Sequence, residues 1–468
     1  MPEDVAAGQA AVAGETAANE SIFSREYRTV TITYAVVMSV TALAGLAIVP
    51  TLPVAARALH GLWLYPVVAT AFVAASVLGG LIGGSWTDKY GVGRPLAVGM
   101  ALAVCTLLVS ATSVSIWQLV AGRFLDGISA GMIAVAVNTA IGRTFSDRLR
   151  PRALALMSAC WIGPSVIGPP VAGLVASWWS WRDVFYGLAV LTVGPAITVA
   201  LRLRDMPRPA ASSEQQRPRA LTALIAVTGA GLLEYAASGW NLAHLGLGVA
   251  AVALLAPSAW RMLPRGTLRG KSGLPTIALL YGLGSGAYFT IEAFVPLLLD
   301  TQRHVAPAIT GLAFTGAAIT WSVASWVQSR SPASRPRHRM VSAGGLLLTA
   351  AAAAGVAGTL PGLPALTAGA ALLLAAAGMG MFSTTLTVLS LASVPSERQG
   401  YASAALVTAQ NLGQIVVLGA ASVMLNAWTA AGSERSGFAA AFGLLAVPTL
   451  LAAGLAVRTA ASRAASDG

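Results

Sequence analysis

Four charged residues lie inside long apolar stretches of this 468-residue chain, and they are Arg123, Asp126, Glu234 and Glu292. A charge at the centre of a bilayer costs at least about 2.5 kcal/mol unless it is paired or faces water, and such residues usually mark a proton or ion pathway. The chemistry available to this set is proton binding and release, or recognition of a cation.

Arg123 and Asp126 are three residues apart, so on a helix they share a face, and Asp126 is the nearest counter-ion for Arg123. Two roles remain open for the pair. It either holds its helix in place as a neutralised unit, or it takes part in proton coupling.

Glu292 has no basic residue within a helical turn. We therefore expect it to be the better proton carrier or cation-binding acid, with a hydrogen-bonded acid of the protein core as the alternative. Glu234 lies near the end of a weaker apolar stretch, where we expect an interfacial position.

Residues for enzymatic chemistry are not grouped in this sequence. We find no nucleophile–base–acid set, no metal-ligand spacing and no phosphate-binding loop before a helix, and so predict no enzyme, metal or cofactor. Cys105 and Cys160 have no partner spacing. The net charge of +12 comes from loop arginines and indicates contact with anionic lipid rather than with nucleic acid.

The elements that would position these residues are membrane-spanning helices. A hydrophobic fraction of 56%, a charged fraction of 10% and a mean hydropathy of +0.73 predict a polytopic membrane protein. Fourteen stretches are long enough to span a bilayer. They lie near 30–50, 63–84, 95–114, 117–141, 153–178, 184–201, 221–237, 243–262, 276–299, 308–327, 340–357, 363–390, 400–425 and 437–457.

Basic residues alternate between the gaps that separate these stretches. Of 29 Lys and Arg, 24 lie in every second gap, and Arg123 lies inside a stretch. By the positive-inside rule, we predict that both termini are cytoplasmic and that the number of spans is even. We expect the protein to lie in the bacterial cytoplasmic membrane. The opposite gaps hold only Arg57, Arg182, Arg303 and Arg435.

The stretches fall into blocks of six, two and six, separated by polar linkers that let blocks move as units. Gly84-Ser85-Trp86 after the second stretch is echoed by Ala324-Ser325-Trp326 after the tenth, which suggests an internal repeat. We predict a disordered cytoplasmic tail at 1–27, an N-terminal six-helix bundle at 28–203, a linker at 204–219, an extra helix pair at 220–263, a linker at 264–275, a C-terminal six-helix bundle at 276–457 and a tail at 458–468.

The loop after the second stretch reads Gly84-Ser85-Trp86-Thr87-Asp88-Lys89-Tyr90-Gly91, with Arg94 close behind. It resembles the signature loop of the major facilitator superfamily, although Val92 and Gly93 stand where basic residues are usual. The resemblance implies that Asp88 meets the start of the thirteenth stretch, near Ser396 to Gly400, when the cytoplasmic side is closed. The alternative is a solvated acid that only caps a helix.

Two further segments carry the same resemblance. The run from Arg123 to Gly131 is similar to the family's Arg-x-x-Gln-Gly-x-Gly, with Asp126 in place of Gln. The fifth stretch is similar to the Pro- and Gly-rich motif of proton-driven drug exporters, with Ala172 where Gly is common. Its residues are Gly163, Pro164, Gly168, Pro169, Pro170 and Gly173. The acid that many fourteen-helix exporters carry in the first helix is absent from Leu43–Pro53.

The chain thus resembles the fourteen-helix drug:proton antiporter group, which implies an all-α membrane protein with the major facilitator fold. The implied function is proton-coupled efflux of amphipathic organic compounds by alternating access. A lipid exporter of the same fold, and a sensor that has this fold but does not transport, are the alternatives. The expected partners are a small amphipathic substrate, protons and the bilayer, and we expect a monomer.

Overall fold

The chain is helical throughout the part that the structure describes, and no strand occurs there. In this computed structural model, the described residues are 21–25, 27–146, 148–202, 217–239, 241–330, 336–395 and 398–459. Helices suit a bilayer because each one satisfies its own backbone hydrogen bonds where no water is available. The all-α class predicted from the sequence is confirmed.

The first block contains the helices that precede the first long linker. They are α2 (Arg28–Ala47), α3 (Leu52–Ala58), α4 (Tyr65–Tyr90), α5 (Gly93–Ala111), α6 (Ile116–Thr144), α7 (Arg150–Ala159), α8 (Ile162–Trp178) and α9 (Trp181–Arg202). Short 3-10 turns, η1 (Val49–Thr51) and η2 (Leu62–Leu64), precede α3 and α4. The first predicted stretch thus continues through η1 and α3, and the fifth is divided between α7 and α8.

The middle pair and the second block follow. Their elements are α10 (Arg217–Ala237), α11 (Leu242–Met262), η3 (Thr267–Arg269), α12 (Leu274–Thr301), α13 (Pro307–Ser329), α14 (Arg337–Gly358), α15 (Leu366–Ala392), α16 (Gln399–Ala430), α17 (Glu434–Leu444) and α18 (Ala446–Leu455).

Twelve spans among the described residues are long and apolar enough to cross a membrane. They cover the two blocks of six. Residues 242–257 of the middle pair form a shorter apolar helix, so the total of fourteen spans stays a prediction. Much of the predicted N-terminal tail and of the first linker lies outside the described residues, but Ile22 is buried and its carbonyl accepts a hydrogen bond from the Thr31 hydroxyl at 2.6 Å.

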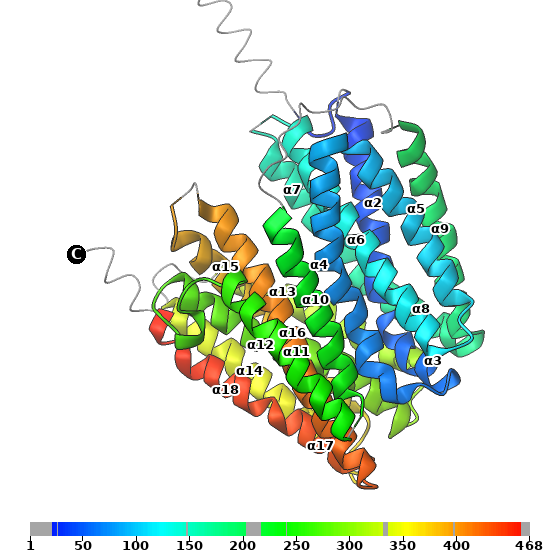
Figure 1. Cartoon of the computed structure of the whole chain (residues 1–468), viewed down its shortest axis with the longest axis vertical. Coiled ribbons are helices and arrows are strands. Elements are labelled where there is room, and N and C mark those ends of the chain that lie inside the picture. Colours follow the sequence, from blue (N-terminus) through cyan, green and yellow to red (C-terminus); the bar gives the residue numbers. More distant parts are fainter. Residues whose placement is uncertain are drawn as a thin grey trace, which may run out of the picture.

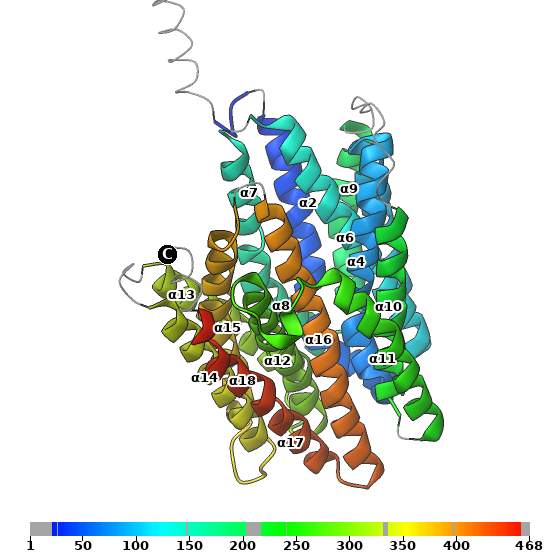
Figure 2. The same ribbon diagram turned by 60° about the vertical axis from the view of Figure 1, so that its left-hand side comes forward.

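The two blocks lie side by side, and the α10–α11 hairpin lies along one flank (Figures 1 and 2). Helix α10 packs against α11, against α4 of the first block and against α16 of the second. Asn426 of α16 donates a hydrogen bond of 2.6 Å to the carbonyl of Ala237 at the end of α10. The hairpin therefore contacts both blocks.

We define the outer end of the molecule as the end that carries the loops α3–α4 and α8–α9, which the arginine pattern predicts to face away from the cytoplasm. Three of the four arginines predicted on this side fix loop backbone. Arg182 donates to the carbonyl of Ser113 at 2.8 Å, and Arg303 donates to that of Gly358 through Nε at 2.9 Å. Arg57 donates to the carbonyl of Asp300 at 2.7 Å. These contacts give the exceptions to the charge pattern a structural role.

Helices α4 and α6 approach each other so closely that only glycine fits between them. A Cβ atom on Gly79 or Gly83 of α4 would overlap backbone atoms of α6, and one on Gly127 or Gly131 of α6 would overlap backbone atoms of α4. Both pairs are spaced four residues apart, which places them on one helix face. Small residues at this spacing let spanning helices approach and gain dispersion energy, since lipid gives no hydrophobic drive for association.

Gly91 ends α4 with φ 79° and ψ 174°, a backbone region that is essentially restricted to glycine. Its amide donates to the carbonyl of Thr87 at 3.0 Å and so closes the helix end in the motif loop.

We expect Gly91→Ala to destabilise the protein by about 1–3 kcal/mol, because a side chain strains this conformation. The measurement is thermal unfolding in detergent. Gly84→Ala is the matched control, since a Cβ there makes an ordinary contact of 3.7 Å with Val135. Equal melting temperatures for the two variants would contradict this account of Gly91.

Candidate functional site

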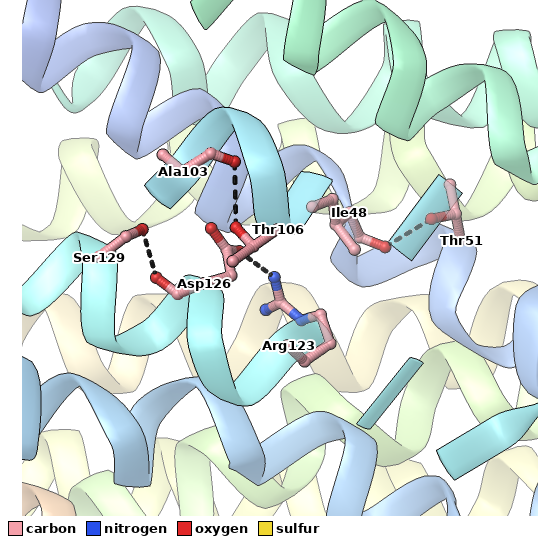
Figure 3. Close-up of polar contacts among 7 residues, drawn as sticks. All are labelled: Ile48, Thr51, Ala103, Thr106, Arg123, Asp126 and Ser129. Carbon is pink, nitrogen blue, oxygen red and sulfur yellow. Dashed lines mark hydrogen bonds and ion pairs between the residues drawn. The ribbon is translucent and has the colours of Figure 1, made fainter. Parts of the chain in front are cut away.

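Arg123 and Asp126 form an ion pair inside the first block, as the sequence predicts (Figure 3). Nη1 of Arg123 donates to Oδ2 of Asp126 at 2.8 Å, and the side chains are only 3% and 6% exposed. Arg123 lies two turns into α6, whose first turn is capped by the Ser115 hydroxyl accepting from the amide of Gln118. The pair is local, short and buried.

The neighbours of the pair come from three helices. The guanidinium of Arg123 lies 4.6 Å from the ring centre of Phe72 in α4, a cation–π contact that the close approach of α4 and α6 permits. Thr106 of α5 lies beside the carboxylate, and the Ser129 hydroxyl donates to the backbone carbonyl of Asp126 at 2.8 Å (Figure 3). Nε of Arg123 is buried and has no hydrogen-bond partner among the described residues.

A cavity of about 390 Å³ separates the first block from α16. Its wall is mainly apolar, with hydroxyl and amide groups at Thr41, Ser76, Thr408 and Asn411. We call this space the central cavity. An apolar wall with a few polar groups is typical of sites for small organic molecules.

The ion pair lies directly behind the wall of the central cavity. Thr41, Phe72 and Ala130 line both that cavity and a small gap next to Asp126. The ion pair is therefore separated from the central cavity by a single layer of side chains.

Glu292 lies in α12 of the second block, away from the ion pair in the chain, and is partly buried. It is not among the residues that line the central cavity. The next residue, Ala293, accepts a hydrogen bond of 2.7 Å from the hydroxyl of Tyr65 at the start of α4. One turn earlier, Tyr288 packs against Trp321 with ring centres 5.0 Å apart. The structure thus places Glu292 beside a contact between the two blocks, near the outer end.

The Pro- and Gly-rich motif joins the blocks. A Cβ on Gly173 of α8 would overlap backbone atoms of Pro307 and Ala308, and one on Gly311 of α13 would overlap those of Pro169 and Pro170. Gly168 faces α2 instead, and Gly163 has open space around it. The motif therefore provides a close crossing between α8 and α13.

Asp88 of the motif loop pairs with Arg143 of α6 at 3.6 Å, and both side chains are more than a third exposed. Lys89 and Arg94 lie over the ring of Tyr90, at 5.1 and 6.0 Å from its centre. Ser396, part of the segment that the sequence predicts as the partner of Asp88, lies outside the described residues. The latch between Asp88 and that segment stays a prediction.

One contact between the blocks was not predicted from the sequence. Asp300, at the end of α12, forms an ion pair of 2.8 Å with Arg57 across the two blocks. The presence of Arg57 on the side with few arginines was the available signal. Glu234 is 1% exposed and its Oε1 lies toward Gly419 of α16, while the interfacial depth expected for it stays a prediction.

We expect Arg123→Met to destabilise the protein by about 3–5 kcal/mol, because Asp126 is then left as an uncompensated buried charge. The double variant Arg123→Met/Asp126→Leu should recover most of this loss, since it buries no charge. Thermal unfolding in detergent gives both values. A double variant as unstable as the single one would show that the two residues do not act as a unit.

The sequence pattern of the Major Facilitator Superfamily matches residues 32–418. A probable multidrug-efflux transporter of Mycobacterium tuberculosis (strain CDC 1551 / Oshkosh) is 29% identical over 421 residues, covering 86% of this chain and 87% of that protein. Multidrug resistance protein MdtL of Escherichia coli (strain K12 / DH10B) is 25% identical over 151 residues, which cover 32% of this chain and 38% of the MdtL chain.

Among solved structures, a peptide transporter in complex with sulfate superposes with a TM-score of 0.68 at 14% identity, covering 92% of this chain and 95% of that one. A D-xylose-proton symporter superposes with a TM-score of 0.65 at 16% identity, covering 92% and 97%. At these identities, the likeness concerns the fold alone.

Proposed function

The chain belongs to the major facilitator superfamily, and from this premise we propose that it is a proton-coupled exporter of amphipathic organic compounds that works by alternating access. It is a multi-pass protein of the plasma membrane, and membership of this family indicates a transporter rather than an enzyme. The relatives are named as a multidrug-efflux transporter and a multidrug resistance protein. These names support export as the direction of transport and drugs as the substrate class.

The observation that carries the proposal is the one-sided closure of the two blocks. The hydrogen bonds and ion pairs between the blocks that are seen among the described residues lie from the outer end to the middle of the molecule. They are Arg57–Asp300, Tyr65–Ala293, Ser177–Ala308 and Val166–Thr315. This arrangement fits a transporter whose central cavity is closed from outside.

The opposite end supports the same interpretation. Tyr401 in the first turn of α16 is 53% exposed at this end. In the proposed cycle, this end closes when Asp88 reaches the start of α16, while the contacts at the outer end separate. An acid at a helix start gains roughly 0.3–1 kcal/mol, enough to bias two forms of similar free energy.

Proton coupling would use Glu292 as the carrier and the Arg123–Asp126 pair as the fixed partner in the other block. Glu292 has no ion-pair partner among the described residues, whereas Asp126 does. Because Glu292 lies beside the Tyr65–Ala293 contact, its protonation would affect the contacts that close the outer end. One charge crossing ~150 mV supplies about 3.5 kcal/mol, which sustains a substrate gradient of roughly 300-fold.

We expect Glu292→Gln to abolish uphill transport of a cationic dye into inverted vesicles with an acidic interior, while dye binding persists. Glutamine keeps the shape but cannot release a proton. Asp183→Asn, an exposed acid in the first turn of α9, is the control and should transport normally. Normal uphill transport by Glu292→Gln would remove this residue from the mechanism, and a non-transporting sensor would show no uphill transport in any variant.

Arg57→Gln should favour the form that is open to the outside, because it removes a partly exposed ion pair from the outer closure. Labelling of a Thr41→Cys probe in the central cavity by an impermeant maleimide, in right-side-out vesicles, should rise by a factor of roughly 1.5–5. The proteins compared also carry Cys105→Ala and Cys160→Ala, so that the probe at position 41 is the cysteine that is labelled.

The matched control is Arg435→Gln, which removes another arginine predicted on the outer side but leaves the Arg57–Asp300 contact intact. Labelling that rises equally in both variants, or in neither, would contradict the role of Arg57 in closing the outer end.

A further inference from the structure

Glu234 is a buried acid that the mechanism above does not use. It lies near the end of α10, is 1% exposed, and neither of its carboxylate oxygens has a hydrogen-bond partner among the described residues. Its Oε1 faces Gly419 of α16, where an added Cβ atom would lie 3.8 Å away. A buried carboxylate without partners is costly, so a partner outside the described protein atoms is expected.

Glu234 lines a cavity of about 500 Å³ that is distinct from the central cavity. We call it the hairpin cavity, because residues of α10 line it together with residues of α4, α6 and α16. Its wall is mostly aliphatic and aromatic, and Glu234 is the sole charged residue among those that line it. Polar groups on the same wall are the hydroxyls of Thr70, Thr228 and Tyr235.

Aromatic rings line the same cavity as Glu234. Trp117 and Phe124 of α6 line the cavity with Tyr235, and the ring centres of Trp117 and Tyr235 are 5.8 Å apart. Aromatic faces attract cations, most strongly when water is excluded. His244 packs on the far side of Tyr235 with ring centres 5.4 Å apart, and Arg123, the residue before Phe124, is engaged by Asp126.

A single acidic group among apolar and aromatic lining residues defines the chemistry of the ligand. A neutral apolar molecule would leave Glu234 without a partner. A proton would neutralise the group but leave the apolar volume of the cavity unfilled, and a hydrated metal ion would find no second carboxylate among the lining residues. A monovalent organic cation with aromatic or aliphatic bulk supplies the charge and fills the apolar volume.

The hairpin cavity and the central cavity share part of their walls. Ala74 of α4 and Ile415 of α16 line both of them. The boundary between the two spaces is therefore the contact between α4 and α16, one helix from each block. A relative movement of the blocks would change that boundary.

We propose that the hairpin cavity binds monovalent lipophilic organic cations with Glu234 as their counter-ion, and that it is an antechamber from which they pass between Ala74 and Ile415 into the central cavity. The proposed binding site depends only on the geometry around Glu234. The passage rests on the proposed export function.

The first test is ethidium binding to the full-length protein in detergent, measured by fluorescence anisotropy. Glu234→Gln should raise the Kd by ~10-fold or more, because it removes the counter-ion. This variant should remain folded, since it removes a buried charge that has no partner among the described residues. The control Glu434→Gln changes an acid of α17 outside the cavity and should leave the Kd unchanged. Equal Kd values for Glu234→Gln and the wild type would overturn the proposed site.

The second test separates binding from passage. Ile415→Trp fills the shared wall and should slow ethidium transport into inverted vesicles, while the Glu234-dependent binding in detergent remains. Unchanged transport in a variant that still binds would overturn the passage but not the site. If the wild type itself bound ethidium without transporting it, the proposed export function would fail and the binding site would stand.

Discussion

The contact between α4 and α6 is the constraint on which the charged site of the first block depends. Four glycines let the two backbones meet, and this places the ring of Phe72 over the guanidinium of Arg123. The same contact keeps the ion pair behind the wall of the central cavity. In a bilayer, such packing has to come from close fit, since lipid solvates apolar helix surfaces as well as another helix does. A larger residue at Gly127 would separate the helices and remove Phe72 from the site.

The three acids within the spans illustrate three ways of holding a carboxylate away from water. Asp126 has a local arginine at 2.8 Å. Glu292 lies beside a contact that joins the two blocks, and Glu234 lies in a cavity without a polar partner among the described residues. The first arrangement is suited to a fixed structural charge, since both ions are satisfied in place. In the other two arrangements, the free energy of the carboxylate of Glu292 or Glu234 depends on what binds to it.

The sequence was most informative where the interaction is local. The spacing of Arg123 and Asp126 was sufficient to predict their ion pair, and the apolar stretches predicted most helices, because both depend on residues within a few turns. Arg57 and Asp300 are 243 positions apart, and their pairing depends on how the blocks meet. The Pro- and Gly-rich motif was recognised in α8, but its packing partner, α13, follows only from the fold. The burial of Glu234 could not be predicted for the same reason, since the packing of α10 against α16 leaves no mark on the α10 sequence.

Helix α10 packs against both α4 and α16, so the hairpin bridges the two blocks. If the two blocks turn relative to each other, α10 has to slide along one of them while it remains attached to the other. The hydrogen bond from Asn426 to the end of α10 favours travel with the second block. Sliding would then take place along α4. Small residues such as Ala71 and Ala74 on that helix offer few side-chain atoms that could interlock with α10.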